Sequence, residues 1–366
     1  MASSRRPLAA VVAAVAVAAV VGGGLLGAAR TPRNQAGAAA APLAASVSAA
    51  PLGLKVPVDA TKLTPGREPQ VTYLRGRTVT GGVSNPVTVP GTAAIEAAAR
   101  LWDTTLTVQV TSGTSSSLVI QDHSGKVVQR ITGVDSLATS ADGKYAAYAS
   151  GGRFSSGEPG GTVYFQEPGT KPAAVLARPE AFDVRVIAVV DRTVYFSSGR
   201  SDGTSWSLYT WDVDQNVVRT TASVASPVSV AARGGLAAGI PVFTDSGLCS
   251  AVTDIASGRQ RWRTCQYRLD RFSPTSAFVI GLPPHGGSPY GEPRTAALDT
   301  KAGKLLREWT GPSLRGAVAE DDDHLLLLWH DRPEPTSRSA VVRCAVSTGR
   351  CELATPLSSE PLLLGS

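Results

Sequence analysis

Short apolar runs separated by turns rich in Gly, Asp and Ser make up most of this 366-residue chain. The stretch from Ser124 to Glu167 shows this pattern most clearly. Its apolar and polar positions predict four strands, at Lys126–Ile131, Asp135–Thr139, Lys144–Ala149 and Thr162–Gln166. Turns at 140–143 and 151–161 separate the later strands. The pattern therefore predicts an all-β protein.

One kind of turn recurs along the chain at a nearly constant spacing. It usually begins with Asp or Ser, or with Glu at 167–171, and it usually ends with Gly followed by Lys or Arg, as in DIASGR at 254–259. The turn centres fall near residues 125, 169, 214, 258, 303 and 349, in steps of 44 to 46 residues. That period is the size of one four-stranded propeller blade. Asp, Ser and Gly suit a short hairpin turn, because it needs a positive φ and a side chain that bonds its own backbone.

Two further strand-like runs precede each of these turns. Several of them, such as LLLLW at 325–329 and AFVIGL at 277–282, are continuously apolar rather than alternating. A strand packed between neighbouring blades is buried on both faces, so a propeller explains these runs. They are too short to be membrane helices.

The two ends of the repeat complement each other. A hairpin at 73–91 lies one period before the first turn, and a lone strand at 360–366 follows the last one. A closing blade built from both termini would complete the ring and remove its sheet edges. We therefore expect a β-propeller of seven four-stranded blades, and the alternative is six blades with an extra hairpin.

The first 29 residues have the composition of an export segment. Arg5 and Arg6 are followed by no charge until Arg30, and the run at 7–29 is long enough to cross a bilayer as one hydrophobic helix. Residues 1–29 are therefore either a membrane anchor or a cleaved signal peptide. The Ala- and Pro-rich segment 30–66 predicts a disordered linker, with the propeller at 67–366. We expect an exported protein held at the cell membrane with the propeller outside. Secretion after signal cleavage is the alternative.

The net charge of +6 does not indicate a nucleic-acid-binding protein. Four of the 35 basic residues lie within the first 33 positions, which leaves 31 basic against 29 acidic residues in the rest of the chain. The propeller is thus close to neutral. We expect no nucleic-acid partner, and membrane contact only through the N-terminal segment.

The four cysteines fall in two symmetric pairs. Cys249 and Cys265 are equidistant from the turn at 254–258, and Cys344 and Cys351 are equidistant from the turn at 346–349. Residues that face each other across a hairpin have Cβ atoms about 4.5–5.5 Å apart, which is close enough to bridge. The pairs predict two disulfides and an oxidising compartment. They lie too far apart in sequence, and lack the CxxC spacing, for a zinc site.

Two runs carry a resemblance to a known family. The run TSADGKYAAYAS at 139–150 is similar to the repeat "SPDGKxLAxxS", and WDVDQNVVRT at 211–220 is similar to the turn "WDxxTGxxxRT". The chain thus resembles the exported WD40-like or TolB-like propellers of bacteria over roughly residues 70–366. The resemblance implies the propeller fold and binding of a protein or ligand more often than catalysis. It supplies no catalytic residue.

Motifs that would indicate an enzyme are absent. The sequence has no G-x-S-x-G, no HExxH and no phosphate-binding glycine loop. His324 and His330 share one predicted strand but lie about 20 Å apart, too far to hold one metal, and we expect both near solvent at strand ends. The acidic run at 320–323 predicts a solvated turn rather than a cation site. Five tryptophans fall in or beside strands and predict packing between blades: Trp206, Trp211, Trp262, Trp309 and Trp329.

The candidate binding residues lie on the longest loops. The loops at 151–161, 198–205, 283–294 and 331–338 each join the second and third strands of a blade, so they emerge on one face of a propeller. The alternative is that an exported propeller simply tolerates long loops. The candidate residues on these loops are Arg153, Phe154, Arg200, His285, Tyr290, Arg294 and Arg332.

These observations predict a non-enzymatic, extracytoplasmic binding or scaffold protein. It would recognise an envelope or extracellular protein, peptide or glycan through its loop-rich face, as a monomer without cofactor or metal. The alternative is a propeller enzyme with its site at the central channel, such as a lyase, a glycan hydrolase or a quinone-dependent dehydrogenase. A purely structural envelope or spore component is a third possibility.

Overall fold

The computed structural model describes residues 54–82, 85–111, 115–151, 159–169, 171–199, 206–244, 247–285, 290–334 and 336–365. The predicted anchor or signal at 1–29 lies outside these residues. Residues Ala49–Ser366 form one compact unit, and the fold below is that of this unit. Within the described ranges, no helix has both the length and the apolar character needed to cross a membrane.

Five four-stranded antiparallel sheets and one larger sheet make up the fold. The first sheet comprises β28 (Leu362–Leu364), β2 (Tyr73–Arg75), β3 (Thr78–Thr80) and β4 (Val87–Thr88). The second comprises β5 (Ala94–Leu101), β6 (Thr104–Val110), β7 (Ser116–Gln121) and β8 (Val127–Thr132). The third comprises β9 (Val134–Thr139), β10 (Ala146–Ser150), β11 (Gly161–Gln166) and β12 (Ala174–Arg178).

The other sheets follow in chain order. The fourth comprises β13 (Phe182–Val190), β14 (Thr193–Gly199), β15 (Trp206–Asp212) and β16 (Val217–Ala225). The fifth comprises β17 (Pro227–Val230), β18 (Leu236–Thr244), β19 (Gly247–Asp254) and β20 (Gln260–Thr264). The eight-stranded sheet comprises β21 (Arg268–Phe272), β22 (Phe278–Leu282), β23 (Glu292–Asp299), β24 (Leu305–Ala319), β25 (His324–His330), β26 (Ser339–Ala345), β27 (Cys351–Leu353) and β1 (Lys55–Pro57).

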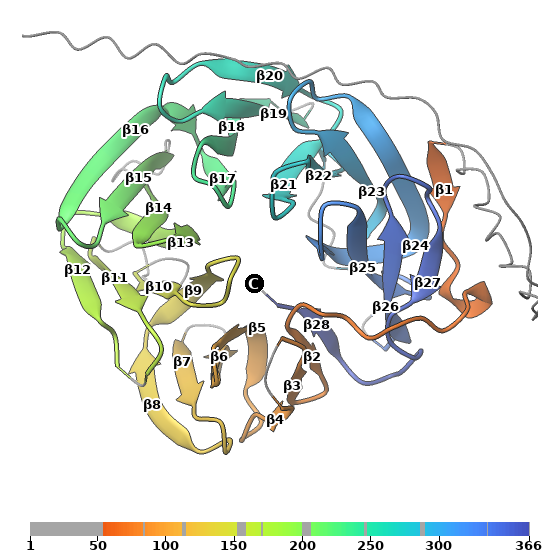
Figure 1. The fold of residues 1–366 in the computed structure, drawn as a ribbon, viewed down its shortest axis with the longest axis horizontal. Coiled ribbons are helices and arrows are strands. Elements are labelled where there is room, and N and C mark those ends of the chain that lie inside the picture. The colour runs from red at the N-terminus through yellow and green to blue at the C-terminus, as the bar shows by residue number, and fades with distance from the viewer. Residues whose placement is uncertain are drawn as a thin grey trace, which may run out of the picture. The chain divides into compact units, whose positions relative to one another are not determined.

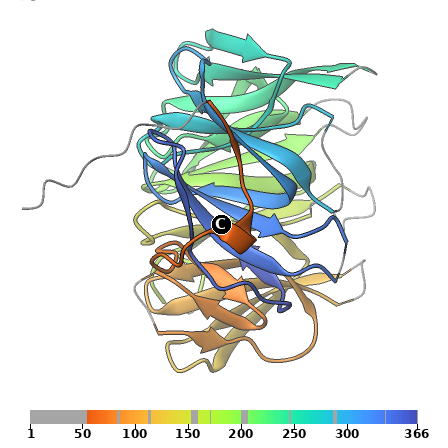
Figure 2. The ribbon, with the colours of Figure 1, turned by 90° about the vertical axis from the view of Figure 1, so that its right-hand side faces the viewer.

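The sheets stand around a central axis, with strands such as β5, β9 and β13 nearest the centre and β8, β12 and β16 at the rim (Figure 1). Figure 2 shows the same ring of sheets from its edge. The hydrophobic core lies between successive sheets, because one buried cluster contains Phe165 of the third sheet together with Phe196 and Trp211 of the fourth. This is the arrangement of a β-propeller, so the prediction of an all-β propeller fold is confirmed.

The long strand β24 belongs to two groups of strands. Its first part pairs with β23 through Thr310 opposite Arg294. Its last part pairs with β25 from Ser313 to Ala319. The register shifts between these parts, so β24 is the outer strand of one four-stranded group and the inner strand of the next. This continuity is why the two groups form one eight-stranded sheet.

The recurring turns lie where the sequence predicted. Each joins the third and fourth strands of its group, as the turn between β7 and β8 and the turn between β26 and β27 do. The four strands predicted between Lys126 and Gln166 are β8, β9, β10 and β11, and each lies within two residues of its predicted bounds. The predicted sharing of one sheet by both chain ends is also found, since β28 pairs with β2 through Tyr73 opposite Leu364.

The predicted linker boundary at residue 66 is wrong. β1 pairs in parallel with β24, and the short 3₁₀ helix η1 (Ala60–Lys62) follows it. Val56 and Val58 are buried in one cluster with Trp309, and the Trp329 indole Nε1 donates to the Val58 carbonyl oxygen at 3.1 Å. Val56 and Val58 pack on residues of β24 and β25, which lie some 250 residues later in the chain. A local sequence pattern cannot reveal such a contact.

Both predicted disulfides are present. Cys249 on β19 is bonded to Cys265, which directly follows β20. Cys344 on β26 is bonded to Cys351, its directly opposite residue on β27. Each bridge therefore joins the third and fourth strands of its group, as the symmetry about the turns predicted.

Candidate functional site

The propeller has two faces of different character. Because consecutive strands are antiparallel, the loops between second and third strands all lie at one end of the sheets, and we call this end the loop face. The turns between first and second strands and between third and fourth strands lie at the opposite end, the turn face. The sequence analysis placed its candidate residues on the loop face.

Three of the four described candidates lie on two neighbouring loops of that face, and the fourth, Arg294, lies on β23. Arg153, Phe154 and Arg200 lie outside the described residues. His285, Tyr290 and Arg332 are all exposed, the first two on the loop between β22 and β23 and the last on the loop between β25 and β26. The structure therefore presents these three side chains to solvent as predicted.

His285 also connects its loop to the preceding sheet. Its ring packs on Gly247, at the start of β19, so closely that a Cβ added to Gly247 would lie 2.7 Å from the His285 Cε1 atom. Gly247 has a φ of +135°, which a side chain would also disfavour. Only glycine fits here, and the two loops thus contact each other.

Arg315, on β24, connects the next pair of loops. Its Nε donates to the Tyr290 carbonyl oxygen at 3.4 Å, and its Nη2 donates to the Glu334 carbonyl oxygen at 2.7 Å. The Ser313 hydroxyl also donates to the Tyr290 carbonyl oxygen. No local pattern indicates these contacts, because Arg315 lies within an ordinary strand and is 25 residues from Tyr290 in the chain.

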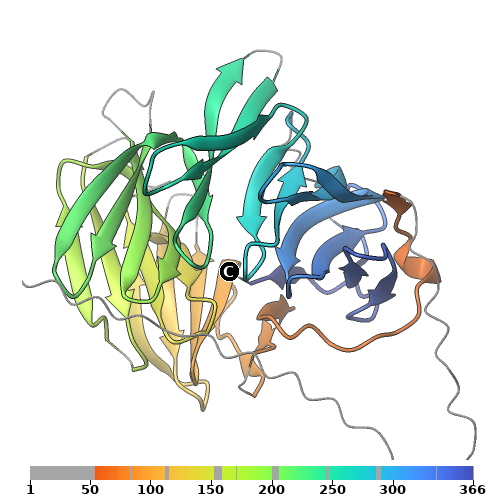
Figure 3. The ribbon, with the colours of Figure 1, turned by 45° about the horizontal axis from the view of Figure 1, so that its top comes forward.

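Phe243 is an exposed aromatic residue that the sequence analysis missed. It lies near the end of β18, on the loop face, and its side chain is 64% exposed. Its neighbour Val242 pairs with Cys249, and the disulfide from Cys249 to Cys265 fastens this part of the β18–β19 hairpin to the outer edge of its sheet. Figure 3 shows this hairpin projecting from the ring. Phe243 lies in an apolar strand as buried residues do, so no local signal in the sequence separates it from the core.

Arg294 has contacts within the fold. Its Nη1 lies 3.6 Å from the Glu308 Oε2 atom, and its guanidinium lies 5.5 Å from the Tyr267 ring centroid. The Tyr267 hydroxyl donates to Glu308 at 2.7 Å, and burial together with Glu308 raises the pKa of Tyr267 to about 12. Arg294 thus helps to hold the buried Glu308, and we leave it out of the binding face proposed below.

His330 is buried, contrary to the prediction that it lies near solvent. It is 7% exposed beneath the loop from 331 to 338, and its Nδ1 lies 2.8 Å from the Ser337 hydroxyl. Burial, and then the nearby Arg315, lower the pKa of His330 to about 4. His330 is the last residue of an apolar strand, a position that the sequence pattern assigns to solvent. The pattern does not show that Ser337 of the following loop lies against it.

This burial should make stability depend on pH. The unfolded chain binds a proton at His330 near its usual pKa of 6.5, whereas the folded protein does so only near 4, so acidification between these values favours unfolding. The free energy of unfolding of the wild type should fall between pH 7 and pH 4.5, and about 2–3 kcal/mol of that fall should come from His330. We expect the fall to be smaller by this amount in His330→Gln. Urea unfolding at both pH values measures this difference. His123→Gln, in an exposed turn, is the matched control, and an equal pH dependence in wild type and His330→Gln would contradict the expectation.

The turn face is hollowed at the ring centre. A cavity of about 460 Å³ is lined there by turns from several sheets, including Arg100, Trp102, Asp142, Pro274 and Glu320. A second cavity, of about 370 Å³, shares Pro274 and other residues with it and is lined by the inner strands β9, β13, β17 and β21. The two spaces therefore follow the central channel, and their size suits a small ligand.

Trp102 stands at the edge of this cavity. It occupies the first position of the two-residue turn between β5 and β6, with its side chain 58% exposed and a φ of +55°. A bulky residue in this conformation costs roughly 1–2 kcal/mol. The sequence analysis assigned the other five tryptophans to packing, and Trp211, Trp309 and Trp329 are indeed fully buried. Trp102 was given no role.

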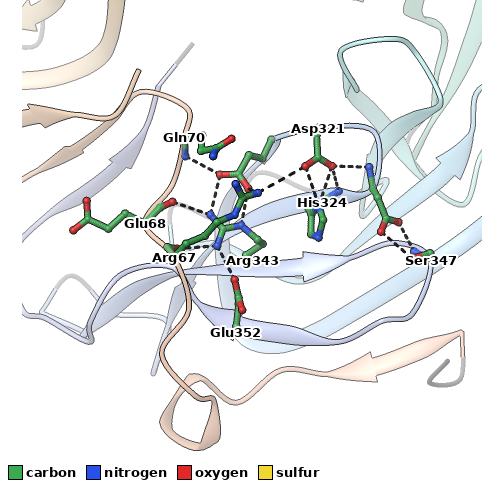
Figure 4. Close-up of polar contacts among 10 residues, drawn as sticks. Arg67, Glu68, Gln70, Asp321, His324, Arg343, Ser347 and Glu352 are labelled. Atoms are coloured by element: carbon green, nitrogen blue, oxygen red, sulfur yellow. Dashed lines mark hydrogen bonds and ion pairs between the residues drawn. The ribbon is translucent and has the colours of Figure 1, made fainter. Parts of the chain in front are cut away.

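The acidic run at 320–323 forms a turn, as predicted, but its first carboxylate, Glu320, is buried rather than solvated. The Glu320 side chain is 1% exposed and accepts hydrogen bonds from Arg343 at 2.6 and 2.9 Å and from the Gln70 backbone N–H at 2.7 Å. Arg343 also contacts Glu352 at 2.7 Å, and Arg67 lies 3.1 Å from Glu320 (Figure 4). Burial opposes the charged form of Glu320, but these donors outweigh it and lower the pKa of this carboxyl.

The other carboxylates of the run also have structural partners. Asp322 accepts from the Ser273 hydroxyl at 2.8 Å and from the Thr275 backbone N–H at 3.0 Å, both on a neighbouring turn. Asp323 accepts from the Ser347 backbone N–H at 2.7 Å. Within the described ranges, no group of three or more His, Cys, Asp or Glu side chains is arranged to hold a metal ion. The run therefore joins segments of the fold.

The sequence matches no protein-family model and no curated protein. Solved structures do match. Hydrazine synthase from Kuenenia stuttgartiensis is 13% identical, with 81% of this chain and 97% of that chain covered and a TM-score of 0.52. Prolyl oligopeptidase B from Galerina marginata is 10% identical, with 80% of this chain but only 52% of that chain covered and a TM-score of 0.51.

TolB from Acinetobacter baumannii is also among the matches. It is 18% identical, with 66% of each chain covered and a TM-score of 0.42. The structural neighbours thus include TolB and other propeller proteins. At these identities the likeness concerns the fold alone.

Proposed function

We propose that this chain is an exported, seven-bladed propeller that binds a protein, peptide or glycan of the cell envelope or exterior through its loop face. The N-terminal segment would hold it at the membrane, or would be removed after export, and the propeller would act as a monomer. The two disulfides support an oxidising compartment. Seven blades are supported by the five separate sheets together with the division of the larger sheet at β24 into two groups.

One observation carries the proposal. Phe243 and Tyr290 are large, exposed aromatic side chains, 64% and 42% exposed, on adjacent loops of one face. The contact of His285 with Gly247 joins these loops, and the disulfide at Cys249 fixes the base of one of them. Exposed aromatic residues on a rigid scaffold are typical centres of protein recognition, because they bury much area and lose little conformational entropy.

Binding also accounts better than catalysis for the polar groups at the channel. The buried carboxylate there, Glu320, is held by Arg343, and Asp322 is held by Ser273 and Thr275. A general acid or base must be able to exchange its proton with a substrate, which such contacts oppose. We therefore propose a binding protein that is not an enzyme.

The double variant Phe243→Ala/Tyr290→Ala tests the proposal. Each truncation of an aromatic anchor typically costs more than about 1 kcal/mol, so the pair should weaken partner binding at least tenfold. The protein is used to capture a partner from native envelope extract, the partner is identified by mass spectrometry, and its affinity is then measured with both purified proteins. Val175→Ala, a truncation of an exposed apolar residue on the rim strand β12, is the matched control. Equal affinity of the double variant and the control would remove the loop face from consideration.

A further inference from the structure

Trp102 also borders a groove on the turn face, separate from the two cavities at the channel. This groove, of about 330 Å³, is lined by Trp102, Lys144, Tyr145, Glu167 and Pro168. Because Trp102 also lines the cavity at the channel mouth, the two spaces adjoin at its indole. The groove thus has an aromatic residue at its inner end and can continue toward the ring centre.

The Trp102 backbone and the Tyr145 ring are held in place by neighbours. The Trp102 backbone N–H donates to the Gly143 carbonyl oxygen at 3.2 Å, which fastens its turn to the next sheet. The Tyr145 ring stacks on Phe165 with centroids 5.4 Å apart, and Arg192 covers Phe165 at 5.3 Å. The Tyr145 ring and the turn that carries Trp102 are therefore fixed before any ligand arrives, which lowers the entropic cost of binding.

The charged groups around the groove are paired with one another. Lys144 Nζ lies 3.0 Å from Asp142 Oδ2, and Glu167 forms an ion pair with Arg192. The groove therefore carries no excess charge and does not favour an ionic ligand. Each ionised carboxylate nevertheless has several acceptor positions, and its ion pair uses only some of them.

We propose that this groove binds a neutral oligosaccharide, with Trp102 as the platform for one sugar ring. A sugar ring has an apolar C–H face that packs on an aromatic ring and an edge of hydroxyl groups that donate and accept hydrogen bonds. Trp102 and Tyr145 supply the aromatic surface, and Lys144 and Glu167 supply a donor and acceptors at its rim. Asp142, the ion-pair partner of Lys144, lines the adjoining cavity and supplies further acceptors there. A proline-rich peptide also packs on aromatic residues, but it has few N–H groups for these carboxylates.

The backbone of Trp102 supports a binding role. Its positive φ is one that glycine adopts without strain, so the fold itself would be better served by glycine at this position. The chain instead has a large indole there, exposed to water. Strain and exposure of this kind are expected where a side chain serves a ligand rather than the core.

Trp102→Gly tests the proposal, because it removes the indole and relieves the strain and so should not unfold the protein. The full chain is titrated with cellohexaose, maltohexaose and chitohexaose by calorimetry, and protection of tryptophan fluorescence from acrylamide is followed in parallel. We expect at least one of these sugars to bind with a dissociation constant below 1 mM, and Trp102→Gly to weaken that binding at least tenfold. Trp102→Phe should retain part of the affinity.

Val175→Ala is the matched control, because it truncates an exposed apolar side chain on β12 that lies outside this groove and outside the loop face. It should bind the sugar as wild type does. The titration uses the purified protein and a sugar without the loop-face partner, so failure of the loop-face proposal and failure of the sugar proposal can be told apart. Absence of binding by all three sugars at 10 mM would overturn the proposal, as would unchanged binding by Trp102→Gly. A decaproline peptide is tested in the same way, and binding of that peptide but of no sugar would assign the groove to a proline-rich partner instead.

Discussion

Replacing Arg343 with methionine is expected to lower the free energy of unfolding by about 3–5 kcal/mol. Arg343 and Glu320 are 3% and 1% exposed, so the substitution leaves a buried carboxylate without its main partner. It also leaves the carbonyl oxygens of Arg67 and Glu68 without their donors. Urea unfolding followed by circular dichroism measures the loss.

Two further variants separate the buried charge from the general loss of contacts. Arg343→Met/Glu320→Leu removes both charges and should recover part of the stability, since no buried charge is then left unpaired. Arg67→Met removes a partly exposed partner of Glu320 and should cost about 1 kcal/mol or less. Should Arg343→Met stay within 1 kcal/mol of the wild type, the pair would have to be water-accessible in solution.

Deleting the last six residues, Pro361–Ser366, is expected to destabilise the propeller by about 3–6 kcal/mol and to make it associate. Leu362 and Leu364 are both nearly buried, and burial of one leucine is worth about 1.5–3 kcal/mol. Without β28, the backbone of β2 also becomes an open sheet edge that can pair with another molecule. Unfolding and size-exclusion chromatography of the truncated chain measure the two effects.

Leu362→Ala/Leu364→Ala tests the apolar part of this effect alone. It retains the backbone pairing, so it should lower stability without causing association. Glu360→Ala removes only an exposed ion pair with Arg75, 2.8 Å long, and should cost less than about 1 kcal/mol. A truncated chain as stable and monodisperse as Glu360→Ala would mean that β28 does not close the ring in solution.

The sequence allowed most of the fold to be predicted, because a propeller repeats one local pattern. The turns near residues 125 and 349 lie at their predicted places, and the cysteines around two such turns form the predicted pairs. The errors concern contacts between distant segments. Val56 packs against Trp309, and Glu320 pairs with Arg343. Val56 and Glu320 each lie in a segment that resembles a loop in the sequence, and each is buried because of a contact with a partner elsewhere in the chain.

The candidate binding residues were harder to predict for a physical reason. Exposure of an aromatic side chain depends on what the neighbouring sheet leaves uncovered, and a single chain segment carries no record of that. Phe243 and Trp102 lie in or beside ordinary strands, as the buried Trp211 does, yet only the first two reach solvent. The positive φ of Trp102 is equally invisible in the letters LWDTT.

The pairing of β1 with β24, ahead of the first four-stranded sheet in the chain, has a mechanical consequence. A pull on the chain from its N-terminal side reaches the folded unit first at β1, whose three residues lie parallel to β24. The load must then pass the hydrogen bonds of Thr64, Gly66, Arg67 and Gln70 to the last strands before it reaches β2. The segment from β1 to Gln70 must therefore detach before tension applied at that end reaches the sheet that closes the ring.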